Sequence, residues 1–498
     1  NTALASGDIF AQQSAQELLP LVQQAILLAK QYDAVIANPP YMGNGYLNPL
    51  LKEFLKKNYG GFEKDLFSAF MIRNLGFSNA SGQLGFMSPF VWMFISSYEN
   101  LRTHFIDNAT ISSLIQLEYS GFDGATVPIC TFTLAKTHIS DFIGSYVRLS
   151  DFKGAENQAP KTLEAILNPS CGWFFNTKPD DFKKIPGSPI AYWVSERVRD
   201  VFENSPPLVK IADTRLGMAT ADNNKFLRLW HEVNMNKTSM GEKNREAAQE
   251  SQKKWFPYQK GGDFRKWYGN MDYLVNWFND GQDIRNFIDK KTGKVRSHNY
   301  NLDYIFKEGV TWNALSSSDT SARISKSSLF DNAGSSLFPF DPKYIKPCLA
   351  FINSKLIKSL IKLISPTLNY QPGDMGKLPF YFNEIQLPDL SNIVSKLVSI
   401  AKSDWDSYET SWDFTENPII RTQQLNLEQA FITWQQQNTD AVSEMKRLEE
   451  ENNKLFIDAY GLQDELTPDV PDEQITLTRA NREKDSQRLV SYALGCMM

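Results

Sequence analysis

The sequence has few cysteines and histidines and no long apolar stretch, and each shortage excludes a class of protein. Four cysteines and four histidines in 498 residues, with no C-x-x-C pair, argue against a zinc site or a disulfide framework, so we expect no metal. The longest apolar runs, such as residues 90–95, are far shorter than the roughly 20 residues that cross a bilayer. No basic-then-apolar leader follows Asn1, so we expect no membrane association, cytoplasmic residence and a chain that begins inside a longer polypeptide.

Length and charge indicate several domains, one of them basic. A chain of 498 residues exceeds what one hydrophobic core usually supports, so we expect two or three domains. Residues 1–204 contain 16 basic residues (Lys and Arg) and 19 acidic residues (Asp and Glu). The counts are 26 basic and 17 acidic over residues 205–380, and 10 basic and 21 acidic over residues 381–498. The basic middle block can hold a polyanion such as DNA, although lysines that merely coat a helical surface would give the same balance.

Apolar residues recur with helical and strand spacing through the first 150 residues. The spacing predicts helices at 11–30, 64–77 and 91–106 and strands at 33–37, 83–87, 111–117 and 127–134. Alternating elements of this kind are typical of a doubly wound α/β domain.

The pattern changes three times further along the chain. Connections rich in Pro and Asn over 151–205 predict a linker. Short strand-like stretches with many Gly, Asn and Ser turns predict an α+β domain over 206–385. Helical spacing from 425 to 459 predicts one long spacer helix within a C-terminal region at 386–498.

The tetrapeptide Asn38-Pro39-Pro40-Tyr41 directly follows the strand predicted at 33–37. Open α/β sheets bind their ligands beyond the carboxyl ends of the strands, so the position and the sequence of this segment agree. Two prolines cannot continue a strand ladder, and a rigid turn without function is the plainer interpretation. The strand immediately before it favours a functional loop.

Such a loop suits methyl transfer to a planar amino group, whose nitrogen lone pair is delocalised and therefore a poor nucleophile. The Asn38 side-chain oxygen and the Pro39 carbonyl can each accept one N–H of the target amine and stabilise the positive charge that develops during attack. Pro39 and Pro40 fix the shape of the loop. Tyr41 offers an aromatic face to a base swung out of a duplex, which offsets part of an unstacking cost on the order of a few kcal/mol.

The tetrapeptide resembles motif IV of the gamma-type amino methyltransferases, and this resemblance extends over most of the chain. The segments that carry it are Ser6–Phe10 (motif III), Asn38–Tyr41 (motif IV), Lys64–Phe70 (motif V), Gly82–Pro89 (motif VI) and Gly121–Val127 (motif VIII). The resemblance implies a partial Rossmann-like methyltransferase domain over 1–150 and S-adenosylmethionine as the methyl donor.

The resemblance also implies roles for single residues. Asp8 would accept a hydrogen bond from the amino group of the cofactor adenine, and Ile9 would line the same pocket. Phe70 would pack against the cofactor adenine. Phe122 would stack on the second face of the flipped base, opposite Tyr41.

The basic block would then be a DNA target-recognition domain over 206–385. Residues 213–226 resemble the opening of such domains, and residues 349–379 resemble their closing strand and helix. Within the family the chain resembles the PglX-like methyltransferases of BREX phage-defence systems. The residues expected to contact duplex DNA, mainly through phosphates, are Lys225, Arg228, Lys260, Arg265, Lys266, Arg323 and Lys326.

The sequence departs from the family at the cofactor site. Gamma-type enzymes place a glycine-rich loop upstream of motif IV, and none precedes Asp8. We therefore expect a fragment that binds S-adenosylmethionine poorly and is inactive alone, taken from a longer active polypeptide. The resemblance implies site-specific transfer of a methyl group to adenine N6 in duplex DNA by base flipping, in a phage-defence or restriction-modification system with further subunits. Two alternatives stay open: methylation of an RNA base or a protein amide, and a DNA-binding specificity module without catalysis.

Overall fold

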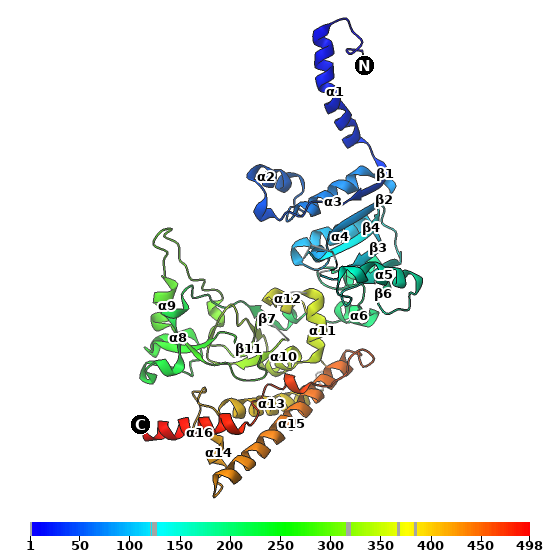
Figure 1. The fold of residues 1–498 in the computed structure, drawn as a ribbon. Helices are drawn as coiled ribbons and strands as arrows, with labels where there is room; N and C mark the ends of the chain where they lie inside the picture. Colours follow the sequence, from blue (N-terminus) through cyan, green and yellow to red (C-terminus); the bar gives the residue numbers. More distant parts are fainter. Residues whose placement is uncertain (1, 120, 122–126, 315–319, 366–368, 383–385) are drawn as a thin grey trace. The chain divides into compact units, whose positions relative to one another are not determined.

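The chain folds into two compact units, Asn1–Arg199 and Asp200–Met498, in a computed structural model. The structure describes residues 2–498 except 120, 122–126, 315–319, 366–368 and 383–385 (Figure 1).

The first unit is built on a six-stranded mixed sheet with the order β1-β2-β4-β3-β5-β6. Its strands are β1 (Tyr32–Ala37), β2 (Ser78–Pro89), β3 (Thr110–Gln116), β4 (Ile129–Ala135), β5 (Gly144–Arg148) and β6 (Phe174–Thr177). The pairs β1·β2 and β3·β5 are parallel, and the other neighbours are antiparallel. The four strands predicted from the sequence correspond to β1, β2, β3 and β4, so the predicted α/β class is confirmed.

The helices of the first unit are α1 (Ile9–Ala29), α2 (Pro49–Asn58), α3 (Leu66–Phe77), α4 (Glu99–Asn108) and α5 (Ala155–Leu167), and α6 (Glu196–Asn204) spans the boundary. Short 3-10 turns are η1 (Asn44–Tyr46), η2 (Phe90–Met93), η3 (Ser96–Tyr98) and η4 (Pro179–Lys184). Pro20 lies inside α1 without ending it, and α1 buries none of its residues (Figure 1). The helix predicted at 91–106 is instead two 3-10 turns followed by α4.

Arg102 explains that break in the predicted helix. Arg102 is 1% exposed, and its guanidinium donates to the carbonyls of Trp92 and Ile95, both at 2.8 Å, and to that of Gly187. The Ile95 carbonyl also accepts the amide of Tyr98 at 3.0 Å, the bond of a 3-10 turn, so this segment turns around the arginine instead of continuing as an α-helix. Burial lowers the pKa of Arg102 to about 10.

Aromatic side chains form the core under the sheet. Trp92 lies against Phe105 and Phe132, with ring centroids 5.6 and 4.9 Å apart. All three are fully buried, and truncating any one of them to alanine would cost roughly 3–5 kcal/mol. The packing holds α4 and the turn η2 against β4, next to the carboxyl end of β2.

The predicted linker at 151–205 is wrong. The segment supplies α5 and the strand β6, which pairs antiparallel with β5. Tyr192 from the same segment stacks on Tyr146 at 4.8 Å, and both rings are buried. Its Pro and Asn residues mark tight connections between packed elements, and the boundary between the compact units falls at 199/200 rather than 205.

The second unit contains two four-stranded sheets, β13-β9-β10-β8 and β12-β11-β14-β7. The strands are β7 (Ala212–Arg215), β8 (Leu227–Leu229), β9 (Trp255–Gln259), β10 (Tyr273–Asn276), β11 (Gly309–Trp312), β12 (Ala322–Ser325), β13 (Leu329–Phe330) and β14 (Ser336–Pro339). With the short helices between them, these strands confirm the α+β character predicted for this part of the chain.

Helices dominate the remainder of the second unit. They are α7 (Asn223–Phe226), α8 (Arg245–Glu250), α9 (Phe278–Arg285), α10 (Ile345–Ile352), α11 (Lys355–Ile364), α12 (Pro372–Gly376), α13 (Leu387–Trp405), α14 (Pro418–Arg421), α15 (Leu427–Ala459) and α16 (Arg482–Met497). The 33-residue α15 is the long helix predicted at 425–459, and α13 and α11 pack against it. Among the helices of the described residues, none combines the length and the apolarity needed to cross a membrane.

Candidate active site

The Asn-Pro-Pro-Tyr loop leaves the sheet at the carboxyl end of β1. Ala37, the last residue of β1, pairs in parallel with Phe86 of β2, so both strands end at the same edge. Beyond that edge Pro39 is buried, whereas Asn38 and Pro40 are exposed. The buried proline anchors the turn, and the carboxamide of Asn38 is presented to solvent.

Tyr41 holds that carboxamide in place. Its hydroxyl donates to the Asn38 Oδ1 at 3.1 Å and lies 3.5 Å from the carbonyl oxygen of Met87 on β2. Its ring meets Phe67 edge to face at 6.4 Å and is 38% exposed, which leaves a face open to a ligand. Partial burial raises the pKa of Tyr41, so its hydroxyl stays a proton donor at neutral pH. Because an amide oxygen has two lone pairs, the Asn38 Oδ1 can accept a second hydrogen bond.

Asp65, which the sequence analysis did not single out, ties the end of the loop to α3. One carboxylate oxygen accepts the amide N–H of Met42 at 2.9 Å and that of Phe67 at 3.2 Å, so Asp65 is also the N-cap of α3. The amide of Leu66 returns a bond to the Met42 carbonyl at 3.0 Å. The only sequence signal for this role is an Asp directly before an apolar helix.

Burial shapes the electrostatics around Asp65. Desolvation raises the pKa of its carboxyl, opposed by hydrogen bonds from the amides of Met42, Phe67 and Leu66. Tyr98, whose ring centroid lies 5.4 Å from that of Phe67, has its pKa raised to about 12 by burial and by the Asp65 charge. The hydroxyl of Tyr98 is therefore neutral, and Asp65 acts as a fixed acceptor.

Replacing Asp65 by alanine is expected to loosen the loop beyond Tyr41. The change removes the acceptor of two amides, and the loss of a helix N-cap costs about 1 kcal/mol. Hydrogen exchange at the Met42 and Phe67 amides checks this, with exchange expected to accelerate about fivefold. Asp65→Asn keeps an acceptor oxygen and should lose less protection. Unchanged exchange at Met42 in the alanine variant would contradict the role.

Resemblance assigned Phe70, Asp8 and Ile9 to the cofactor and Phe122 to the second face of the flipped base. Phe70 is 41% exposed on α3, one turn after Phe67. Asp8 is the N-cap of α1 and accepts from the amides of Phe10 and Ala11, while Ile9 is 75% exposed. Their role at the cofactor stays a prediction. Phe122 lies outside the described residues.

Four of the predicted DNA-contacting residues sit at the surface of the second unit. Lys225 and Lys326 are exposed. Arg228 is partly buried and donates to the carbonyls of Asn224 and Leu227, both at 2.6 Å. The Lys260 side chain is 28% exposed, with its Nζ 3.9 Å from the Asp331 carboxylate. Their contact with DNA stays a prediction.

Of the other three cations, Lys266 and Arg323 are buried, so their prediction as DNA contacts is wrong, whereas Arg265 is partly buried and its contact with DNA stays a prediction. Arg323 is fully buried and donates to the Arg265 carbonyl and the Asn313 Oδ1. Arg265 pairs with Asp404 at 2.9 Å, and Lys266 pairs with Glu449 on α15 with both side chains almost fully buried. Charge counts along a sequence do not distinguish such paired cations from a basic surface.

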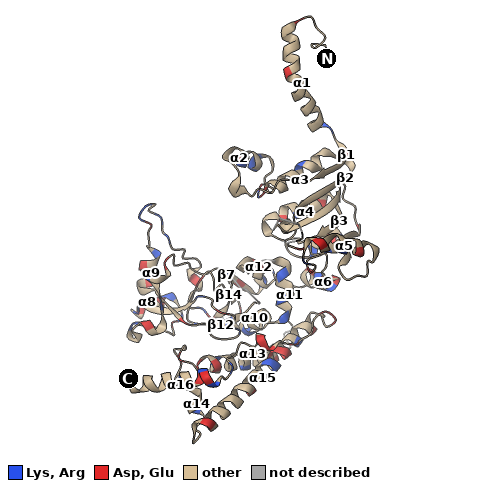
Figure 2. Cartoon of the chain, viewed as in Figure 1, with Lys and Arg blue, Asp and Glu red and all other residues tan. Residues whose placement is uncertain are grey.

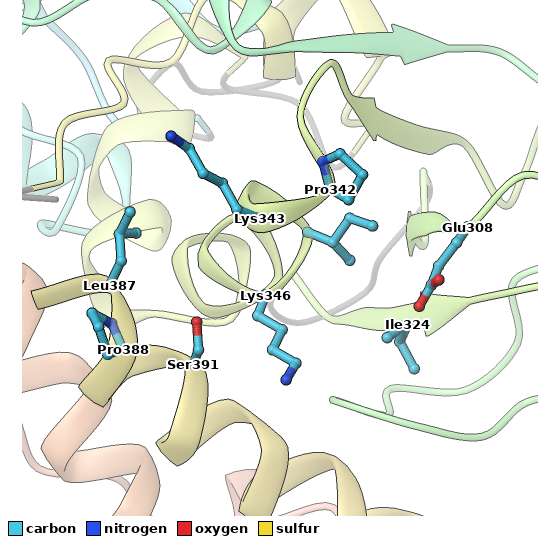
Figure 3. Close-up of a pocket in the computed structure, with 9 residues that line it drawn as sticks. Glu308, Ile324, Pro342, Lys343, Lys346, Leu387, Pro388 and Ser391 are labelled. Carbon is cyan, nitrogen blue, oxygen red and sulfur yellow. The ribbon is translucent and has the colours of Figure 1, made fainter.

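A pocket of about 570 Å³ lies in the second unit. Figure 3 shows Lys346 of α10 and Ser391 of α13 beside it, and the Lys346 ammonium donates to the Ser395 hydroxyl at 2.8 Å. None of the predicted site residues lines it. Within the described ranges, no three His, Cys, Asp or Glu side chains gather closely enough to hold a metal ion.

The fold and the loop together define a class. An α/β sheet in which a strand runs parallel to its neighbour and ends in an Asn-Pro-Pro-Tyr loop is the arrangement that the resemblance to amino methyltransferases implies, with the loop where open α/β sheets bind their ligands. Residues 8–122 match the family described as Eco57I restriction-modification methylase.

Relatives match nearly the whole chain. It is 38% identical over 491 residues to the adenine-specific methyltransferase PglX of Lacticaseibacillus casei (strain Zhang), which covers 97% of this chain and 40% of that protein. It is 34% identical over 519 residues to the adenine-specific methyltransferase BrxX of Escherichia coli O9:H4 (strain HS), covering 99% and 40%. In sequence the chain is therefore PglX-like, and it spans about two fifths of the length of these curated relatives.

A solved structure shares the fold. The Type IIL restriction-modification enzyme MmeI, determined in complex with DNA, superposes with a TM-score of 0.54 over 94% of this chain and 58% of that one. The two are 13% identical in sequence, so this likeness concerns the fold alone.

Proposed function

We propose that the polypeptide carrying this chain transfers a methyl group from S-adenosylmethionine to N6 of adenine in duplex DNA. The observation that carries the proposal is the Asn38 carboxamide, exposed at the carboxyl end of β1 and held by the Tyr41 hydroxyl. The names of the PglX and BrxX relatives support adenine as the target. A place in a phage-defence or restriction-modification system, with the other subunits of that system as partners, belongs to the same proposal.

The loop would bind and polarise the adenine amino group. The Asn38 Oδ1 has one lone pair engaged by Tyr41 and one free, and the Pro39 carbonyl provides the second acceptor. Two acceptors fix both N–H bonds and stabilise positive charge on the nitrogen as the new N–C bond forms. The open face of Tyr41 would stack on the flipped base, with Phe122 proposed for the other face.

S-adenosylmethionine would supply an electrophilic methyl group. The exposed ring of Phe70 on α3 fits a contact with the cofactor adenine. The Asp8 carboxylate has one oxygen engaged by the amides of Phe10 and Ala11, which leaves the other for an amino group. Phe70, Asp8 and Ile9 are therefore the residues proposed to hold the adenine end.

The substrate class is tested by following the methyl group. Mixed-sequence duplex DNA, RNA of the same sequence and a glutamine-rich protein are each incubated with the polypeptide and S-adenosylmethionine, then digested for mass spectrometry. N6-methyladenine is expected in the duplex DNA alone. Methyl groups on RNA or on the protein amide would overturn the DNA assignment. Tight DNA binding without any methylation would instead indicate a specificity module.

A further inference from the structure

Residues 287–296 of the second unit form a narrow hairpin that projects beyond α9 (Figure 1). Ile288 and Val295 pair as an antiparallel bridge. The amide of Asp289 donates to the Lys294 carbonyl at 2.8 Å, which closes the next rung. The projecting segment is therefore a short hairpin closed by one β-bridge and the backbone hydrogen bonds of its turn.

The turn at its tip is fixed by its single acidic residue. The Asp289 carboxylate accepts from the amides of Lys291 and Thr292, both at 2.9 Å, and from the Thr292 hydroxyl. These bonds hold the pKa of Asp289 below its usual value. Gly293, with φ of +68°, supplies the left-handed residue that closes the turn. The carboxylate is committed to the backbone, so the lysines around it remain available.

Cations surround this turn (Figure 2). The three at the tip, all exposed and with no ion pair among the described residues, are Lys290, Lys291 and Lys294. At the base, Phe287 lies between the Lys225 Nζ and the Arg296 guanidinium, at 4.3 and 5.0 Å from its ring centroid. Four cations thus lie on the hairpin, and Lys225 of α7 adds a fifth at its base.

The stem of the hairpin is apolar and open. Its two β-branched side chains are about half exposed, Ile288 at 51% and Val295 at 48%. A solvated lysine coat needs neither a rigid turn nor an exposed aliphatic pair. An apolar stem with a cationic tip suits a surface that has phosphates along its rims and apolar groups between them.

We propose that this hairpin enters the major groove of the duplex DNA substrate, with its tip lysines on the phosphates; this rests on the proposed function for the identity of the substrate. The major groove of B-form DNA, about 12 Å wide, admits a two-stranded ribbon, and thymine methyl groups lie on its floor. The deep, narrow major groove of A-form RNA does not admit one. The partner is therefore a DNA duplex rather than an RNA duplex.

The test is the salt dependence of DNA binding by the full chain. Lys290, Lys291 and Lys294 are changed together to glutamine, and a control variant changes the exposed Lys396, Lys454 and Lys484 in the same way. Each phosphate contact contributes about 0.9 to the slope of log Kd against log salt concentration. The slope of the hairpin variant should therefore be smaller than that of the wild type by roughly 2–3. The control should keep the wild-type slope, and both variants should unfold at the wild-type temperature.

The outcomes separate the two proposals. If wild-type and hairpin variant bind DNA with the same slope, the hairpin assignment is overturned while the DNA substrate stands. An RNA duplex of the same sequence, bound as tightly as the DNA duplex and equally weakened in the variant, would overturn the groove assignment. If the wild-type chain binds no duplex DNA at any salt, both proposals fail, and methylation of RNA or protein by the polypeptide would then identify the real substrate.

Discussion

Asn38→Ala is expected to lower methyl transfer to duplex DNA by roughly 100- to 1000-fold, because a preorganised group aimed at developing charge typically contributes that much. The variant keeps the prolines and therefore the shape of the loop, but it removes one of the two acceptors for the adenine amino group. The loss should fall on the rate at saturating DNA, since the nitrogen gains its charge only as the methyl group arrives. Single-turnover transfer of labelled methyl groups by the polypeptide measures it.

A matched variant separates chemistry from folding. Asn108→Ala removes an exposed asparagine of the same unit, at the end of α4, and should leave the rate unchanged. The methyl-transfer rate of Tyr41→Phe should lie between the rates of Asn38→Ala and Asn108→Ala. This variant removes the hydroxyl that donates to the Asn38 Oδ1 at 3.1 Å but keeps the aromatic ring that would stack on the base. Full activity in Asn38→Ala would refute the role proposed for the loop, and equal loss in Asn108→Ala would point to a folding defect.

The sequence was sufficient to predict the helices and strands whose formation depends on residues adjacent in the chain. The apolar run before Asn38 predicted β1, and two prolines ended it at the residue where the strand ends in the structure. Helical spacing likewise predicted α15 within two residues at its start. Backbone periodicity and proline chemistry are local, so they can be read without knowing what packs against them.

The sequence was insufficient where a residue's role depends on a distant partner. Asp65 acquires its function by accepting the amide of Met42, 23 residues earlier. Arg265 and Lys266 looked like DNA contacts, but their carboxylate partners lie 139 and 183 residues further along the chain. The lysines of the 287–296 hairpin carry the same type of charge but have no carboxylate partner in the part of the chain that the structure describes, which the sequence does not reveal.

Glu449→Ala is expected to destabilise the second unit by about 3–5 kcal/mol, because it leaves the charge of a buried lysine without its ion-pair partner. Glu449 of α15 accepts from the Lys266 ammonium and from the Trp267 indole N–H at 2.7 Å, so one carboxylate joins α15 to the segment before β10. Equilibrium unfolding in urea, followed by tryptophan fluorescence, measures the loss. Glu444→Ala on the same helix removes an exposed ion pair with Arg447 and should cost well under about 1 kcal/mol.

The double variant Lys266→Met with Glu449→Leu tests why Glu449→Ala loses stability. It distinguishes the cost of a buried lysine charge without a partner from the cost of lost packing contacts. It removes both charges and fills the space with apolar atoms, so it should recover more than half of the stability lost in Glu449→Ala. The remaining deficit is the Trp267 N–H left without an acceptor. If the double variant is no more stable than Glu449→Ala, the cost lies in packing and the ion pair is incidental. Recovery in the double variant would also mean that a single Lys266 substitution weakens DNA binding through loss of stability, because it leaves the buried Glu449 charge without its partner.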